Sequence, residues 1–247
     1  MTNQDILDFL ESFAPFATAE DWDNPGLLIG SPEDELDHVA VALDATPEAI
    51  EAAKAVGAQL LLTHHPMIFT PLRAIPRRHP AFLAAEAGLS VIAAHTNLDK
   101  AAGGVNDALA ALLGLTDVTV TEDGFCRIGT LPTPMQGFAL GELVASTLHT
   151  AVRVNKDTPV KTLAVCGGAG GFGAVDMVGK ADAFLTGEVK HHEWLEANAL
   201  GIVVLEAGHY ATEQPVVDAL RDKLTEAFPA LTVTKLANGA PYDTVLG

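Results

Sequence analysis

The chain has little cysteine, little basic charge and no long apolar run. Among its 247 residues are 2 cysteines, Cys126 and Cys166, which are too few and too isolated for a disulfide framework or a zinc ribbon and fit a reducing cytosol. The 14 basic and 32 acidic residues give a net charge of −18, so we expect no direct nucleic-acid binding. No apolar run is long enough to span a bilayer, and residues 1–5 lack a basic signal-peptide region, which predicts a cytoplasmic protein without a membrane segment.

The composition is that of a compact globular protein, with 49% hydrophobic and 19% charged residues. A chain of this length holds one large domain or two small ones. Its one dense basic cluster is Arg73 with residues 77–79. We interpret this cluster as a solvated loop, and a contact to a phosphate or polar substrate is the alternative.

Short apolar runs alternate with helical patterns along both halves of the chain. The runs lie at residues 39–43, 60–63 and 91–94 in the first half and at 163–166, 183–186 and 202–205 in the second. Thr46 followed by Pro47 predicts the N-cap and first turn of a helix between the first two runs. This alternation is typical of an α/β protein whose strands have parallel neighbours.

The second half repeats the plan of the first. Asp44 and Thr63, at the ends of the first two runs, have counterparts 123 residues later at Gly167 and Thr186. The third runs are 111 residues apart, because the first half has a longer loop. This ordered series predicts an internal duplication. We expect a first repeat at 1–115, linking strands at 116–138 and a second repeat at 139–247, with the strand-like residues 231–236 returning to either half.

Five residues at the ends of three predicted strands have the identities of metal ligands. They are His64, His65, Asp99, His209 and Glu213. In open α/β sheets, sites form beyond the carboxyl ends of the strands. Three imidazoles and two carboxylates are more than one ion usually takes from protein, so the set predicts two adjacent divalent ions that activate a water.

Each of these residues has an ordinary structural alternative. Adjacent histidines on a regular strand point to opposite faces, although Pro66 ends regular pairing and allows His64 and His65 to point the same way. Asp99 alone is typical of a helix N-cap or a turn. His209 and Glu213 have the i, i+4 spacing of an exposed helical pair. Their coincidence at equivalent strand ends favours the metal site.

Neighbouring polar residues are candidates for supporting roles. Asp44, His95 and Glu188 are expected to orient the imidazole ligands, although His95 also fits a packed core histidine. Glu188 is the counterpart of His65 in the second half and is a candidate proton acceptor, with His191 or His192 as the acid. The alternative for Glu188 is an ordinary helix start. The glycine-rich residues 167–171 indicate a tight turn or a phosphate cradle.

Several of these segments resemble the motifs of the Nif-three-like family of type 2 GTP cyclohydrolase I homologues. The matching residues are 22–27, 63–66, 95–99, 186–192 and 208–213. The resemblance runs over nearly the whole chain and implies two intertwined, duplicated α/β repeats with mixed sheets. It implies that His64, His65, Asp99, His209 and Glu213 hold a dinuclear centre in the cleft between the repeats. The chain is too short for the extra middle domain of some members.

The resemblance also implies an activity and an assembly. The activity is a metal-dependent hydrolysis in which water attacks C8 of the guanine of GTP and formate is released, with Glu188 and His192 as candidate catalytic residues. The two divalent ions are zinc, iron, manganese, cobalt or nickel. The partners expected are a small molecule such as a nucleotide and further copies of the chain in a hexameric ring. The alternatives are a metal-dependent phosphoesterase and a non-enzymatic metal-handling or scaffold protein.

Overall fold

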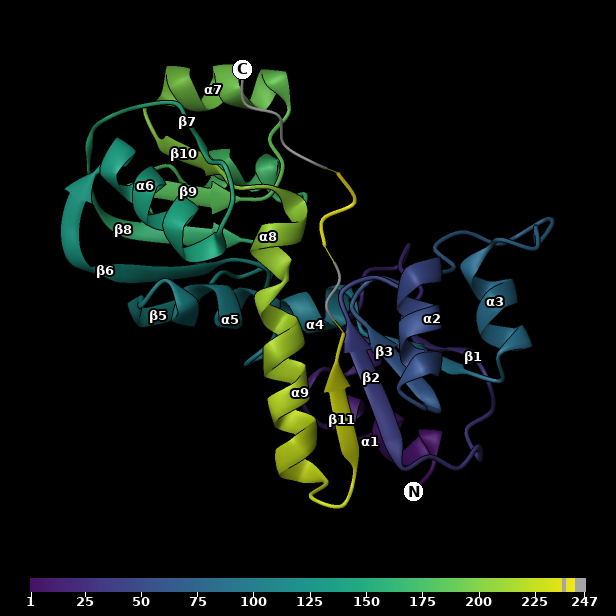
Figure 1. Ribbon diagram of the computed structural model, residues 1–247. Helices are drawn as coiled ribbons and strands as arrows, with labels where there is room; N and C mark the ends of the chain where they lie inside the picture. Colours follow the sequence, from purple (N-terminus) through teal and green to yellow (C-terminus); the bar gives the residue numbers. More distant parts are fainter. Residues whose placement is uncertain (237–238, 243–247) are drawn as a thin grey trace. The chain divides into compact units, whose positions relative to one another are not determined.

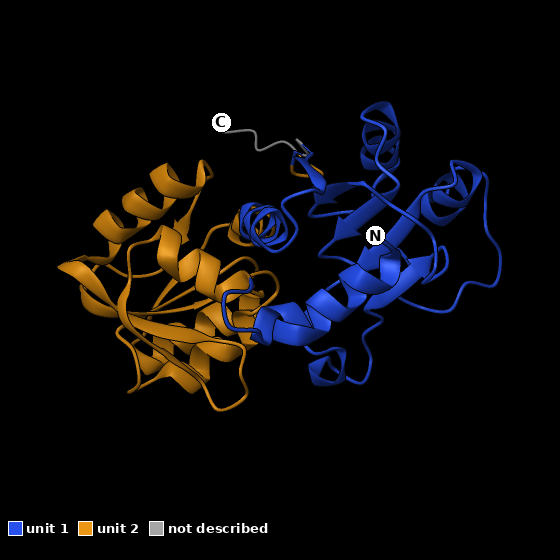
Figure 2. Ribbon diagram, turned by 90° about the horizontal axis from the view of Figure 1, so that it is seen from below, with its two compact units in different colours: residues 1–104, 216–239 blue, residues 105–215, 240–247 orange. Residues whose placement is uncertain are grey.

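The computed structural model describes residues 1–236 and 239–242, and the chain divides into two compact units (Figures 1 and 2). The first unit comprises residues 1–104 and 216–239, and the second comprises residues 105–215 and 240–247. The predicted second repeat, 139–247, includes residues 237–238 and 243–247, which lie outside the described part of the chain. The repeat boundaries at 115 and 139 stay a prediction.

The first unit is built on a five-stranded sheet with the order β1-β4-β3-β2-β11. Strands β2, β3, β4 and β11 are parallel, and β1 is antiparallel to β4. The strands are β1 (Gly26–Ile29), β2 (His38–Ala42), β3 (Leu60–Thr63), β4 (Ser90–Ala93) and β11 (Thr232–Lys235). The helices are α1 (Asn3–Phe13), η1 (Phe16–Thr18), α2 (Pro47–Ala55), α3 (Pro80–Glu86), α4 (Thr96–Lys100) and α9 (Pro215–Ala227).

The local sequence explains how this unit places its strand ends. The Thr46 side chain accepts a hydrogen bond from Ala49 N at 3.1 Å with Pro47 in the first turn, which confirms the predicted start of α2. The apolar faces of α2 and α3 bury against β2, β3 and β4 in one core cluster that includes Ile50, Leu61 and Val91. The last strand, β11, pairs with β2, so the strand-like residues 231–236 return to the sheet of the first half.

The second unit is built on a six-stranded sheet with the order β5-β6-β8-β9-β10-β7. Strands β8, β9 and β10 are parallel, whereas β5, β6 and β7 pair in antiparallel fashion. The strands are β5 (Thr116–Val120), β6 (Arg127–Gln136), β7 (Arg153–Val154), β8 (Pro159–Cys166), β9 (Ala183–Thr186) and β10 (Val203–Glu206). The helices are α5 (Val105–Leu112), α6 (Gly137–Leu148), η2 (Gly171–Met177), α7 (His191–Leu200) and α8 (His209–Glu213). Both sheets are mixed, which confirms the predicted α/β class.

The strand register can be compared with the predicted duplication. In the first sheet, Ala42, Thr63 and Ala93 are aligned across β2, β3 and β4. In the second sheet, Cys166, Thr186 and Glu206 are aligned across β8, β9 and β10. The offsets between aligned residues are therefore 124, 123 and 113, where the sequence spacing predicts 123, 123 and 111. The order and direction of three consecutive strands agree, and the offset at the ends of β3 and β9 is the predicted one.

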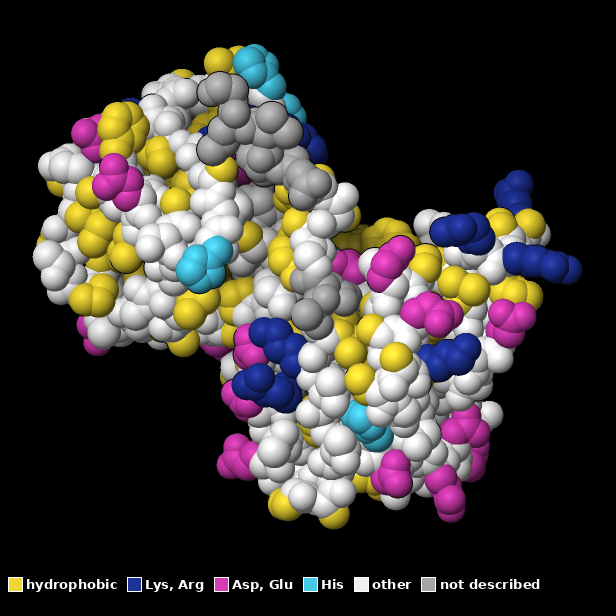
Figure 3. Space-filling view, in the orientation of Figure 1, with side chains coloured by type: hydrophobic (Ala, Val, Ile, Leu, Met, Phe, Trp, Pro, Cys, Tyr) yellow, Lys and Arg dark blue, Asp and Glu magenta, His cyan; other side chains and the backbone are white. Residues whose placement is uncertain are grey.

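Acidic side chains are spread over the face shown in Figure 3, and basic side chains lie in two groups, one near α3 and the loop before it and one near α9 and β11. Arg73, Arg77 and Arg78 in this loop are all exposed. The imidazole of His79 instead accepts a hydrogen bond from Ala81 N and caps α3. These positions favour the solvated-loop interpretation of the basic cluster. None of the helices in the described part of the chain is long and apolar enough to pass through a membrane.

Candidate metal centre

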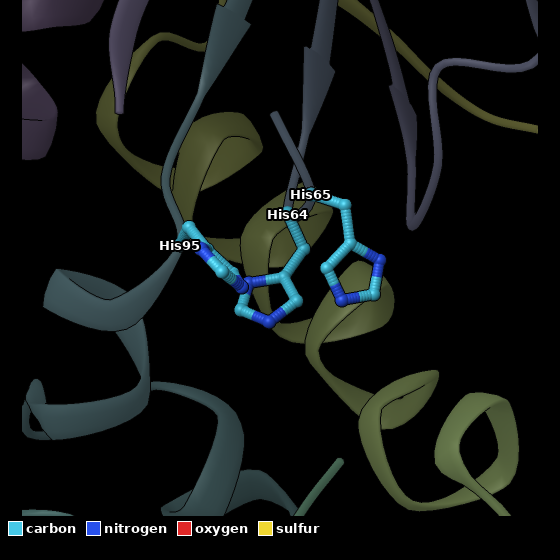
Figure 4. A group of neighbouring side chains, drawn as sticks. All are labelled: His64, His65 and His95. Carbon is cyan, nitrogen blue, oxygen red and sulfur yellow. The ribbon is translucent and has the colours of Figure 1, made fainter. Parts of the chain in front are cut away.

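The two adjacent histidines lie at a break in strand pairing directly after β3. The backbone N–H groups of His64 and His65 both donate to the Leu43 carbonyl, at 3.2 and 3.0 Å, which regular strand alternation does not allow. Their rings lie on the same side of the chain with centroids 4.8 Å apart (Figure 4). The break before Pro66 therefore brings two imidazoles into one site.

Both imidazoles are held through Nδ1. His64 is fully buried, and its Nδ1 lies 2.9 Å from the Ala94 carbonyl oxygen. His65 Nδ1 lies 2.7 Å from Asp44 Oδ1, which confirms the supporting contact predicted for Asp44. Because a carbonyl and a carboxylate accept hydrogen bonds, each Nδ1 carries the proton and each Nε2 presents a lone pair. This is the tautomer that a metal ligand needs.

Asp99 completes the acidic side of this group. It lies in the first turn of α4, which follows β4, and its Oδ1 is 3.7 Å from His64 Nε2. The Asp99 side chain is 14% exposed, whereas the His64 side chain is fully buried. A carboxylate beside an imidazole lone pair at the end of a parallel strand is a suitable donor set for a divalent ion.

His95 lies beside these two histidines and is anchored by a buried carboxylate. Its Nδ1 donates to Asp23 Oδ1 at 2.7 Å, and its ring centroid is 5.1 Å from that of His64 and 5.4 Å from that of His65. The ligand atoms of the three histidines lie within 4.8 Å of one another, so the group can hold a metal ion. Figure 4 shows His95 reaching this group from the end of β4.

Asp23 is a long-range anchor that sequence reasoning did not identify. Its side chain is fully buried and also accepts hydrogen bonds from Thr96 N at 3.0 Å and Thr96 Oγ1 at 2.5 Å. Burial raises the pKa of Asp23, but the hydrogen bonds from His95 and Thr96 outweigh burial and hold the pKa well below its usual range. The ionised carboxylate thereby fixes both the tautomer and the direction of the His95 ring.

An exposed aromatic pair stands next to His95. Trp22 and Phe69 are 57% and 48% exposed, and their ring centroids lie 5.6 Å apart. Each ring also packs at about 6 Å from the His95 ring, at 6.2 and 6.1 Å. The Asn24 amide donates to the Ile68 carbonyl at 2.6 Å and so ties the two loops together. The first unit therefore presents an aromatic surface beside its histidine group.

The second unit carries a smaller group on one turn of helix. His209 and Glu213 are the first and last residues of α8, and their i, i+4 spacing puts them on one face, with Nε2 and Oε2 3.0 Å apart. His209 Nδ1 donates to Glu188 Oε1 at 2.7 Å, so in the neutral imidazole Nε2 presents a lone pair towards the Glu213 carboxylate. Two acceptor atoms at this distance repel each other unless a proton or a metal ion lies between them.

The glycine-rich turn after β8 packs directly on this pair. The amides of Gly167 and Gly168 donate to Asn106 Oδ1 and Thr212 Oγ1, at 2.7 and 3.0 Å. Gly168 has φ +64°, and a Cβ atom there would lie 2.1 Å from Glu213 Oε1. Because these amides are used within the unit, the structure favours a tight turn over a phosphate cradle.

The structure thus brings the predicted ligands together in two groups, three in the first unit and two in the second. His64, His65 and Asp99 form one group, and His209 and Glu213 form the other. Shared coordination of the same ions by both groups stays a prediction. Glu188 orients His209, whereas His192 is exposed at the start of α7, and their predicted catalytic roles stay predictions.

Comparison with known proteins identifies the family. The profile of Duf34/NIF3 (NGG1p interacting factor 3) matches residues 1–239. Two proteins named GTP cyclohydrolase 1 type 2 homolog are similar, one from Lactococcus lactis (33% identity, covering 89% of this chain and 91% of that protein) and one from Methanocaldococcus jannaschii (34%, 86% and 90%).

Solved structures share the fold of this chain. The Staphylococcus aureus hypothetical protein SA1388 has 26% identity and a TM-score of 0.93, with 99% of each chain covered. Reduced HcgD from Methanocaldococcus jannaschii has 30% identity and a TM-score of 0.84, with 96% of this chain and 98% of that chain covered. With a match over almost its whole length, the chain belongs to the Duf34/NIF3 family.

Proposed function

We propose that this protein is a dinuclear-metal-dependent hydrolase that resembles type 2 GTP cyclohydrolase I. The proposed metal ligands are His64, His65, Asp99, His209 and Glu213. The observation that carries the metal site is the state of the three imidazoles. Each donates its Nδ1 proton to an oxygen, from Ala94, Asp44 or Glu188, and each therefore offers Nε2 to a cation.

The chemistry of the donor set fits two divalent ions. Imidazole nitrogen with carboxylate oxygen suits zinc, iron, manganese, cobalt and nickel. Such ions supply Lewis acidity and lower the pKa of bound water when they are present. The close approach of His209 Nε2 to Glu213 Oε2 fits a metal ion bound by both atoms, because two lone pairs at 3.0 Å repel each other unless a metal ion or a proton lies between them.

The surroundings of the histidine group support a small planar substrate. Trp22 and Phe69 offer exposed aromatic surface beside His95, and aromatic rings stack well on nucleobases. His65 keeps 22% of its side-chain exposure, so a small molecule can approach the group. These features, with the names of the curated relatives, support water attack on C8 of the guanine of GTP and release of formate.

The supporting residues have separate tasks in this proposal. Asp44 and Glu188 hold the rings of His65 and His209 in the ligating tautomer. Asp23 holds His95, whose Nε2 is then available to the substrate or to a water. Glu188 is therefore proposed as a positioning residue, in place of the proton-accepting role that the sequence predicts for it.

The test uses protein reconstituted separately with each of the five metals. Formate and phosphate release are measured with GTP and with a panel of phosphoesters, for the wild type and for His64→Ala and His209→Ala. Formate release that both substitutions abolish is the expected result. His149→Asn, at an exposed histidine with φ +52° that asparagine also tolerates, is the matched control and should retain activity.

Three results would contradict the proposal. Turnover that survives in both alanine variants would remove the metal centre from the reaction. Phosphate release without formate would move the assignment to a phosphoesterase, and tight metal binding without any turnover would leave a metal-handling protein. The hexameric ring and the cytoplasmic location stay predictions. Light scattering, which measures the mass of the assembly in solution, tests the hexameric ring.

A further inference from the structure

The two cysteines are neighbours across one sheet, although 40 positions separate them in the sequence. The antiparallel register of β6 and β8 pairs Arg127 with Val165 and Ile128 with Ala164, so the next pair outward is Cys126 with Cys166. Both are buried, with 4% and 5% exposure, and both belong to one core cluster in the second unit. The two cysteines are thus far apart in the sequence but neighbours in the fold, and both are free thiols.

The pair occupies a position at which a disulfide can form without moving the strands. Thr121 N donates to the Cys126 carbonyl at 3.1 Å, and Cys126 N donates to Thr121 Oγ1 at 3.0 Å. Both backbone groups of Cys126 therefore point away from β8, which makes Cys126 and Cys166 a non-hydrogen-bonded pair. Such pairs have Cα atoms about 4.5 Å apart, within the range of about 4.4–6.8 Å that a disulfide spans.

The two thiols already interact. The Cys166 thiol donates a hydrogen bond to the sulfur of Cys126, and this bond lowers the pKa of Cys126 below its usual value even though burial raises it. A lowered pKa gives Cys126 a larger thiolate fraction than an ordinary thiol has, and the thiolate is the nucleophilic form. Cys166 is then placed to react with whatever forms on Cys126.

Glycine backbone lies over the two sulfur atoms. A Cβ atom at Gly170 would lie 2.7 Å from Cys166 Sγ, and one at Gly173 would lie 3.9 Å from Cys126 Sγ. A side chain at Gly170 would therefore displace Cys166 Sγ, whereas the distance at Gly173 is an ordinary van der Waals contact.

We propose that Cys126 and Cys166 form a redox modification site, which hydrogen peroxide converts reversibly into an intrachain disulfide. The Cys126 thiolate attacks one peroxide oxygen and breaks the O–O bond, which forms a sulfenic acid, and the expelled hydroxide takes up the proton lost by the thiol and leaves as one water. The Cys166 sulfur then attacks the sulfenic sulfur, which forms the S–S bond and releases a second water. Two thiols and one peroxide thus give one disulfide and two waters, and a dithiol returns the pair to the reduced state.

This pairing changes the fate of the protein under oxidation. A sulfenic acid without a nearby thiol proceeds to sulfinic and sulfonic acids, which dithiols do not reduce. A resolving cysteine at a cross-strand position stops this sequence at the disulfide. The closed ring spans about 40 residues of the second unit, so the bond also restricts its unfolded state.

The test treats the reduced full-length protein with a small excess of hydrogen peroxide and maps its peptides after alkylation. The expected product is one peptide pair linking residues 126 and 166, lighter by two hydrogens, which dithiothreitol separates. The oxidised protein should remain unchanged in oligomeric state and unfold at a temperature about 5 °C higher. In Cys166→Ala, Cys126 should advance to the sulfinic acid, and dimedone should trap it as the sulfenic acid on the way.

The variant Cys166→Ser is a second test of the loss of the resolving thiol. A circular dichroism spectrum of each variant shows whether this loss, and not unfolding, causes the oxidation of Cys126 to the sulfinic acid. The proposal is overturned if folded wild type and folded Cys166→Ala oxidise Cys126 to the sulfinic acid at the same rate. It is also overturned if the wild type forms only intermolecular disulfides. Neither result depends on metal or on turnover, so this test stands apart from that of the proposed function.

Discussion

Replacing Asp23 by asparagine should lower the free energy of unfolding and remove a part of the pH dependence of that free energy. The buried Asp23 carboxylate accepts hydrogen bonds from His95 Nδ1, Thr96 N and Thr96 Oγ1. An asparagine carbonyl can keep the two bonds from Thr96, but its amide then faces His95 Nδ1 as a donor. The variant therefore loses one charge-assisted hydrogen bond and weakens two others, and each charge-assisted bond is worth about 1.5–3 kcal/mol.

We expect a loss of about 2 kcal/mol in the free energy of unfolding at pH 7. For a chain of this size that loss lowers Tm by about 4–8 °C. The folded-state pKa of Asp23 is depressed, so its contribution is fully present above the unfolded-state pKa of about 3.9. It is lost as the pH falls from there towards the folded-state pKa. The difference between wild type and Asp23→Asn should therefore shrink between pH 4 and pH 2.5, as judged by the urea midpoint.

The matched control is Asp21→Asn, because Asp21 is exposed two residues away. It should change the free energy of unfolding by less than about 0.5 kcal/mol at either pH. An Asp23→Asn variant as stable as this control would refute the reasoning. A difference from wild type that stays constant from pH 7 to pH 2.5 would refute the assignment of the buried charge.

Three further substitutions test other parts of the structure. Glu188→Gln should weaken metal binding about 10-fold to 100-fold in a competition titration, because the His209 ring is then no longer held with its proton on Nδ1. The control Glu196→Gln, on the exposed side of α7, should leave metal binding unchanged. An effect of Glu188→Gln on kcat with unchanged metal affinity would favour proton transfer by Glu188. Gly168→Ala should lower the free energy of unfolding by at least about 1 kcal/mol and weaken metal binding, because the new Cβ atom would collide with Glu213 Oε1. Unchanged metal affinity in this variant would contradict the prediction. Arg127→Ala should cost about 3–5 kcal/mol in chemical denaturation, because it leaves a cavity where the fully buried guanidinium lies and removes its hydrogen bonds to Asp107 Oδ1 and the Gly124 carbonyl, both at 2.7 Å. A loss below about 1 kcal/mol would contradict this reasoning.

Much of the candidate site could be predicted because short-range signals mark it. His64 and His65 stand directly before Pro66 at the end of an apolar run, and the broken alternation that Pro66 predicts is present as two amides that share the Leu43 carbonyl. The repeat offset of 123 predicts Glu188 as the counterpart of His65, and each residue lies two positions after the end of its strand, β9 or β3. Periodicity and strand ends were sufficient for these positions.

The parts that the sequence did not predict depend on contacts between distant segments. Asp23 meets His95 across 72 positions, and no local spacing marks that contact. The cysteine pair depends on the register of β6 against β8, and a register is fixed by packing of the whole sheet. The aromatic pair of Trp22 and Phe69 depends on two loops that the Asn24 side chain ties together. Loop geometry of this kind has no periodic signature.

The most direct test of the central claim is a crystal structure of the metal-loaded protein with anomalous diffraction at the metal absorption edge. We expect two ions about 3.5–4 Å apart. His64, His65 and Asp99 should contribute ligand atoms together with His209 and Glu213. A single ion held by His64, His65 and His95 alone, with His209 and Glu213 beyond coordination distance, would contradict the claim.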